Sequence, residues 1–96
     1  MIEVTDFQAD VLEREGTYLL FFHADWAPPS IKLLKDLKGF DVLPVLAVDV
    51  DAQPKATSYM DVRAVPMLFL MEGGTPVRHK IGYHPTETIL GLLEVE

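Results

Sequence analysis

An uninterrupted run of large apolar residues near the start of the chain constrains the fold most. Residues 18–22 read Tyr-Leu-Leu-Phe-Phe, with no polar residue among them. A strand with one face in water alternates apolar and polar residues, whereas a strand covered on both faces reads as a continuous apolar run. We therefore expect residues 18–22 to form a central strand of an α/β protein, with helices on both faces of its sheet.

A helix, a second buried strand and a short helix are predicted to follow. Residues 30–38 place leucines and an isoleucine at helical spacing, and residues 45–50 repeat the pattern of a buried strand. Pro54 suits the first turn of a short helix, because the amides of that turn have no partner and proline has no amide hydrogen. The helix over residues 30–38 has two alternative inward stripes: Ile31, Leu34 and Leu37, or Leu33 and Leu37.

The start of the chain predicts a short strand and a first helix. Residues 2–4 are a candidate strand, and a side-chain oxygen of Thr5 or Asp6 can cap the helix that follows. Gly16 is expected to end this helix. Its apolar face consists of Phe7, Val11 and Leu12.

The end of the chain predicts a β-hairpin and a last helix. Residues 67–71 and 77–81 are strand-like and flank Gly73 and Gly74, which supply the positive φ angles of a tight turn. Pro85 opens a last helix, whose apolar residues are Ile89, Leu92 and Leu93. The predicted element order is therefore β-α-β-α-β-α-β-β-α.

Length and charge set further limits. The chain has 96 residues, which suits one domain over residues 1–96, and its net charge of −7 disfavours binding to nucleic acid or to an anionic membrane. Its acidic start lacks the pattern of a signal peptide, and no apolar run reaches the length of a membrane span. We expect a cytoplasmic monomer that binds neither nucleic acid nor membrane.

The segment that joins the central strand to the next helix resembles a known active site. Residues 21–30 read Phe-Phe-His-Ala-Asp-Trp-Ala-Pro-Pro-Ser. This segment resembles that of thioredoxins, in which a strand leads through Trp-Cys-Gly-Pro-Cys into a helix. Val65-Pro66 resembles the family's segment with a cis proline, and Gly82 matches the glycine after the last strand. The resemblance covers essentially the whole chain and implies the thioredoxin fold, a central mixed β-sheet flanked by helices.

The residues that carry thiol chemistry in that family are absent. Ala27 and Ser30 stand at the positions of the two redox cysteines, and the chain contains no cysteine. A dithiol enzyme needs a thiolate at the amino end of a helix and a second thiol that resolves the mixed disulfide. The resemblance also puts Phe21 at the position of a buried carboxylate and Ala47 at that of its lysine partner. We expect no thiol-disulfide exchange and no cofactor.

The resemblance also implies a groove for a protein partner. In the family, the tryptophan borders the surface where partners dock, and the residue before the cis proline pairs with an extended partner segment. Trp26 has a second interpretation, compatible with the first, as an apolar lid over the start of the helix. The residues that match the groove are Trp26, Pro28, Pro29, Val65, Pro66 and Gly82.

Two other groups of residues are weaker candidates for chemistry. No glycine-bearing calcium-loop pattern follows Asp49 and Asp51, so we expect solvated strand ends and no metal site. A nucleophile pair of Ser30 with His23 lacks an orienting third group and an oxyanion site in the sequence spacing.

Three functional hypotheses follow. The first is a redox-inactive domain that binds an extended segment of another protein in the groove. The second is a cysteine-substituted form, engineered or drifted, of a protein-disulfide oxidoreductase. The third is a passive accessory or assembly subunit. Restoring cysteine at positions 27 and 30 and assaying disulfide reduction separates the first two.

Overall fold

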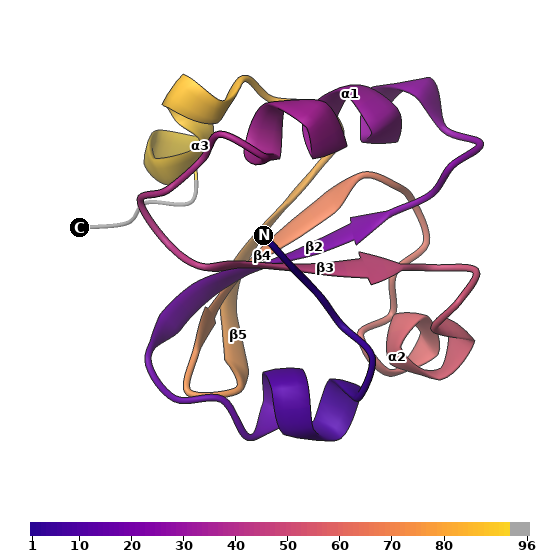
Figure 1. The fold of residues 1–96 in the computed structure, drawn as a ribbon, viewed down its shortest axis with the longest axis vertical. Helices are drawn as coiled ribbons and strands as arrows, with labels where there is room; N and C mark the ends of the chain where they lie inside the picture. Colours follow the sequence, from indigo (N-terminus) through magenta and orange to yellow (C-terminus); the bar gives the residue numbers. More distant parts are fainter. Residues whose placement is uncertain (93–96) are drawn as a thin grey trace.

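The computed structural model describes residues 1–92 and, within them, a mixed five-stranded sheet in the order β1-β3-β2-β4-β5 (Figure 1). β1, β3 and β2 run parallel, whereas β4 is antiparallel to β2 and β5 is antiparallel to β4. The strands are β1 (Ile2–Glu3), β2 (Thr17–His23), β3 (Val45–Asp49), β4 (Met67–Glu72) and β5 (Thr75–Ile81).

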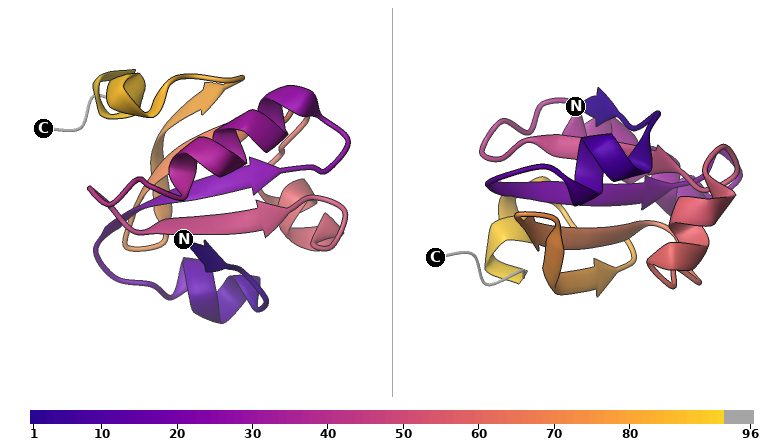
Figure 2. Two further views of the ribbon diagram at one scale, coloured as in Figure 1. Left: turned by 45° about the horizontal axis from the view of Figure 1, so that its top comes forward. Right: turned by 90° about the horizontal axis from the view of Figure 1, so that it is seen from below.

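Helices cover both faces of this sheet. One face carries α1 (Pro28–Leu37) and α3 (Thr86–Leu92), and the other carries the π-helix η1 (Gln8–Leu12) and α2 (Pro54–Tyr59) (Figures 1 and 2). The observed order matches the predicted one, and the expected α/β architecture of a central mixed sheet flanked by helices is confirmed. None of the helices described here has the length and apolar character needed to cross a membrane.

β2 supplies the core on both sides of the sheet. Alternate residues of this strand enter two separate clusters, Leu20 and Phe22 on the η1 and α2 side, and Leu19 and Phe21 on the α1 side. This alternation explains the continuous apolar run, because both faces of the strand are covered. On α1 the buried stripe is Leu33 and Leu37; the alternative stripe is wrong, since Ile31 is 42% exposed.

The first helix differs most from its prediction. It is a π-helix that ends at Leu12, well before Gly16, and the amide of Glu13 donates to the Gln8 carbonyl at 3.0 Å. Asp6 provides the capping oxygen, which accepts the Ala9 amide at 3.2 Å. Tertiary contacts compete with α-helical bonding here, since the Tyr18 hydroxyl donates to the Val11 carbonyl at 2.5 Å.

The hairpin and the last helix lie close to where the sequence puts them. Gly73 and Gly74 form the turn between β4 and β5 with φ of +55° and +84°. In α3, Ile89 is buried as expected. Leu93 and the side chain of Leu92 lie outside the described part of the chain.

Candidate binding surface

The loop between β2 and α1 carries the residues at the two cysteine positions. Ala27 is buried and precedes α1 in an extended conformation, and Pro28 and Pro29 form the exposed first turn of the helix. Ser30 is fully buried, and its Oγ accepts the amide of Ala24 at 2.9 Å. This hydroxyl therefore closes the loop onto the helix. No hydrogen bond joins it to His23 within residues 1–92, so the structure gives no support to a nucleophile pair.

The space beneath α1 is apolar. Phe21 on β2 and Ala47 on β3 are register partners, and both are fully buried in the cluster under α1. These are the positions at which the resemblance places a buried carboxylate and its lysine partner. An ionised carboxylate in such surroundings would need a charged or hydrogen-bonding partner. The apolar pair removes that requirement together with the group that could move a proton to or from a thiol.

Trp26 stands on the surface and is hydrogen-bonded through its indole. Its side chain is 67% exposed, and its indole Nε1 donates to Asp51 Oδ2 at 2.9 Å. Asp51 lies in the turn after β3, so this bond ties the loop before α1 to the neighbouring strand end. The sequence suggested only a solvated carboxylate at this position. The structure shows that Asp51 instead holds the tryptophan.

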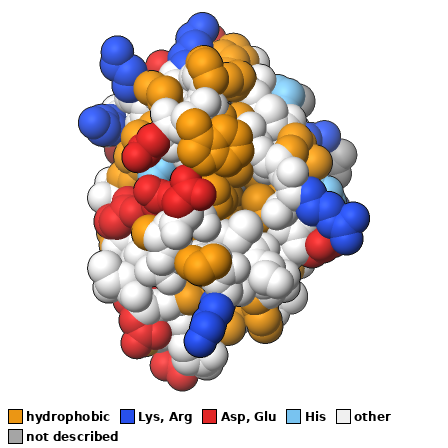
Figure 3. Space-filling model, turned by 90° about the vertical axis from the view of Figure 1, so that its right-hand side faces the viewer, with side chains coloured by type: hydrophobic (Ala, Val, Ile, Leu, Met, Phe, Trp, Pro, Cys, Tyr) orange, Lys and Arg blue, Asp and Glu red, His pale blue; other side chains and the backbone are white. Residues whose placement is uncertain are grey.

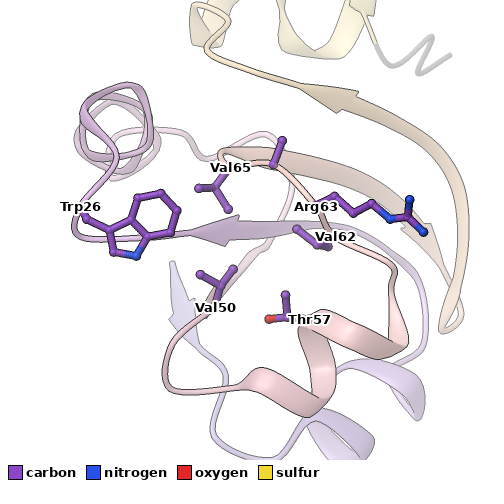
Figure 4. Close-up of a pocket in the computed structure, with 7 residues that line it drawn as sticks. Trp26, Val50, Thr57, Val62, Arg63 and Val65 are labelled. Atoms are coloured by element: carbon purple, nitrogen blue, oxygen red, sulfur yellow. The ribbon is translucent and has the colours of Figure 1, made fainter.

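A small apolar hollow lies beside the indole. Figure 4 shows Trp26 at one end, Val50 and Val65 flanking it, and the Arg63 guanidinium pointing away, where its Nε pairs with Asp61 at 3.0 Å. The volume of about 140 Å³ is close to that of a cavity of roughly 150 Å³, which accommodates a benzene-sized molecule. One large apolar side chain would therefore fit. The hollow is lined by Trp26, Val50, Thr57, Val62, Arg63, Ala64 and Val65.

The segment around Pro66 forms the rim of this hollow. The Val65–Pro66 peptide bond is cis, Pro66 is buried, and its carbonyl accepts the Gly82 amide at 2.9 Å. Val65 is half-buried, and its own N–H and C=O make no hydrogen bond in the portion of the chain described. Backbone polar groups need a partner from protein or water, so these two groups are available to a bound chain.

The structure brings only some of the expected groove residues together. Trp26 and Val65 line one hollow, and Gly82 is joined to Pro66 by a hydrogen bond. Pro28 and Pro29 lie exposed at the start of α1 and do not line the hollow.

Sequence reasoning missed Val50 and Val62, whose apolar side chains come from turns after β3 and α2. Apolar residues in turns were the available signal, but their neighbours depend on the fold.

Comparison with known proteins settles the family. The family model described as Thioredoxin matches residues 1–94. The chain belongs to the thioredoxin family. A thioredoxin from Alicyclobacillus acidocaldarius is 34% identical over 83 residues, which cover 81% of this chain and 79% of that protein. A thioredoxin from Rickettsia typhi is 31% identical over 96 residues, covering 91% of this chain and 90% of its own.

One further relative carries the same domain within a larger protein. A bifunctional thioredoxin reductase/thioredoxin from Mycobacterium leprae is 34% identical over 88 residues, which cover 84% of this chain and 19% of that protein. The resemblance drawn from residues 21–30 is thereby confirmed at the level of family and fold. The absence of cysteine is in keeping with a redox-inactive member of this family.

Proposed function

We propose that this thioredoxin-family domain binds an extended segment of another protein across Trp26, the hollow beside it and Val65. The main support is the exposed indole, which Asp51 holds over an apolar hollow. Tryptophan is enriched among the residues that dominate binding energy at protein interfaces. A tryptophan fixed before binding also loses little conformational entropy on contact.

The mode of binding follows from the groups on either side of the hollow. The N–H and C=O of Val65 would pair with the backbone of an extended segment, as in the addition of a strand. One large apolar side chain of that segment would enter the hollow of about 140 Å³. The occupant is therefore an extended peptide with a leucine- or phenylalanine-sized anchor.

Substitution of Trp26 tests this proposal. Peptides are first selected from a random display library on the unmodified domain, and their dissociation constants are measured by calorimetry. We expect Trp26→Ala to weaken these peptides about tenfold or more, because the anchor loses its main contact. Tyr59→Ala is the matched control, since both side chains are 67% exposed and Tyr59 lies outside the hollow. That control should change affinity by less than about twofold.

Backbone pairing has its own readout. In ¹⁵N NMR spectra the Val65 amide should show one of the largest shifts on addition of a selected peptide. Peptides that bind Trp26→Ala as tightly as the parent, or that shift amides far from Val65, would contradict the proposal. Circular dichroism of each variant shows that the fold is retained.

The two other hypotheses are a cysteine-substituted oxidoreductase and a passive accessory subunit. The apolar Phe21–Ala47 pair and the buried Ser30 hydroxyl weigh against a simple cysteine-substituted oxidoreductase, because more than the two thiols is changed. Nothing in the described residues bears on a passive accessory role, and a cytoplasmic setting stays a prediction.

A further inference from the structure

A second group of functional side chains lies at the carboxyl ends of β2 and β3, outside the hollow. His23 ends β2, Asp49 ends β3, and the two are register partners. Asp25 follows in the loop that leads to α1. One ring nitrogen of His23 and one carboxylate oxygen of each aspartate lie within 4.8 Å of one another. On this face of the molecule, acidic side chains gather around a histidine beside a hydrophobic patch (Figure 3).

The imidazole points independently to a ligand. The His23 side chain is buried with a residue exposure of 6%, and its Nε2 has no hydrogen-bond partner in the described chain. The carboxylate oxygen Glu3 Oε2 lies 3.9 Å from this Nε2, which is too far for a hydrogen bond. Buried polar atoms are nearly always satisfied by protein, water or an ion. The buried imidazole beside these two carboxylates therefore carries an unpartnered Nε2, which water or an ion would have to satisfy.

The charges around the imidazole favour a cation. Asp25, Asp49 and Glu3 are all close to the ring, and the ion pairs seen within residues 1–92 bring no lysine or arginine to them. Asp49 is also held in place, because its Oδ1 accepts the amides of Asp51 and Ala52 at 2.9 and 3.3 Å. The Asp49 side chain clusters with those of Asp25 and His23, whereas the Asp51 carboxylate bonds to the Trp26 indole.

We propose that His23, Asp25 and Asp49 bind a divalent transition-metal ion, for which Zn²⁺ is the best fit. One imidazole nitrogen and two carboxylate oxygens form a ligand set typical of such ions, whereas Mg²⁺ and Ca²⁺ take oxygen ligands. Donors bound to zinc lie about 2.0–2.2 Å from the ion and hence roughly 3.4 Å apart. Closing from 4.8 Å needs only a small movement, which the exposed Asp25 side chain can make. Water completes the coordination on the solvent side.

Calorimetric titration of the full chain with Zn²⁺ alone tests this site. We expect one Zn²⁺ per chain, and Asp25→Asn should weaken binding about tenfold or more because a charged ligand is lost. Asp41→Asn is the matched control, since Asp41 is exposed, lies outside the cluster and loses the same charge. It should leave the affinity within about twofold. Asp25 is exposed in a loop, so its substitution tests the site without disturbing the core.

NMR and a second ion separate ligation from simple charge attraction. The imidazole resonances of His23 should shift with Zn²⁺, while those of His79 and His84 should not. Zn²⁺ should bind about tenfold or more tightly than Mg²⁺, because only the transition metal gains from an imidazole ligand. Four results would overturn the proposal: no binding at millimolar Zn²⁺, equal affinity in Asp25→Asn, equal affinity for Mg²⁺, or shifts confined to the other histidines. None of these readouts depends on peptide binding at Trp26.

Discussion

Ser30 stands at one of the two cysteine positions, and its hydroxyl has a structural task there. The hydroxyl is fully buried and accepts the Ala24 amide at 2.9 Å, which holds the loop that carries Trp26 against α1. A group buried and engaged in this way cannot reach a substrate in the described conformation. Position 30 therefore supports the proposed binding surface indirectly, through the loop that carries Trp26.

Replacement of Ser30 by alanine tests this role. The Ala24 amide would remain buried without an acceptor, so we expect Ser30→Ala to lower the free energy of unfolding by about 1–3 kcal/mol. Urea denaturation measures the change. Ser58→Ala on α2 is the control, because Ser58 is an exposed serine in a helix, and its loss should cost less than about 0.5 kcal/mol. Equal costs for the two serines would rule out a special role for the buried hydroxyl.

At the scale of elements, the β4–β5 hairpin and η1 position each other. The hairpin turn packs against the end of η1 so closely that a Cβ on Gly74 would lie 2.2 Å from the Leu12 carbonyl oxygen. A Cβ on Gly73, whose φ is also positive, would meet no atom within 4 Å. Both Gly73 and Gly74 are thus needed for their positive φ angles. Gly74 is needed for a second reason, because a side chain there would overlap Leu12.

Two alanine substitutions in this turn distinguish the need for a positive φ angle from the lack of space for a side chain. We expect Gly74→Ala to destabilise the protein by about 2 kcal/mol or more, since backbone strain and overlap with backbone atoms add together. Gly73→Ala should cost only about 1 kcal/mol, because strain acts alone. Thermal denaturation of both variants provides the comparison. If Gly73→Ala proved the more damaging, the close approach to η1 would not be the dominant constraint.

The start of η1 should make stability depend on pH. Asp10 accepts the amides of Asp6 and Thr5, both at 3.1 Å, and these bonds lower the pKa of its carboxyl below the ordinary value of 3.8. A pKa lowered by folding stabilises the native state above pH 3.8, and this contribution is lost as the pH falls through the lowered value.

Asp10→Asn is therefore expected to destabilise the protein at pH 7 and to matter progressively less below pH 3.8. Urea unfolding at both ends of this pH range measures the difference from the parent protein. Asp41→Asn is the control, because Asp41 is exposed and its carboxylate makes no hydrogen bond or ion pair within residues 1–92. A destabilisation by Asp10→Asn that stays constant down to strongly acidic pH would show that charge on Asp10 is not the cause.

At the scale of the whole molecule, the fold brings the positions that match the family's redox cysteines to the start of α1 but packs apolar side chains beneath that helix. Phe21 and Ala47 come from neighbouring parallel strands and meet beneath the helix. The helix dipole is still present to lower the pKa of a thiol at position 27, but Phe21 and Ala47 stand where the family has a buried carboxylate and its lysine partner. The chain therefore has the family's fold without the carboxylate and lysine that the family carries at positions 21 and 47.

Restoring cysteine at positions 27 and 30 measures how much disulfide reduction the fold supports without the family's acid–base residues. We expect Ala27→Cys with Ser30→Cys to reduce insulin disulfides roughly tenfold or more slowly than the Alicyclobacillus acidocaldarius thioredoxin assayed beside it. The cause is the missing acid–base group at Phe21, whose contribution new thiols do not replace. Ala27→Cys alone, which has no resolving thiol, is the control. A rate equal to that of the relative would favour the cysteine-substituted oxidoreductase over a domain specialised for binding.

The sequence by itself determined the order of elements, the central strand, the glycine turn and the absence of thiols. These features depend on residues close together in the chain: the apolar run over residues 18–22, the adjacent glycines at 73 and 74, and a motif without cysteine. Family membership could also be inferred from such local motifs. The choice of Leu33 over Ile31 as the inward residue of α1 was left open, because both stripes fit helical spacing.

Only the tertiary structure decided which side chains meet. The bond from Trp26 to Asp51 and the hollow closed by Val50 and Val65 join segments that the chain separates by at least 15 residues. The pairing of His23 with Asp49 depends on the register of two parallel strands, and a shift of one residue would turn either side chain to the opposite face. Contacts of this kind follow from packing in three dimensions, which local patterns do not encode.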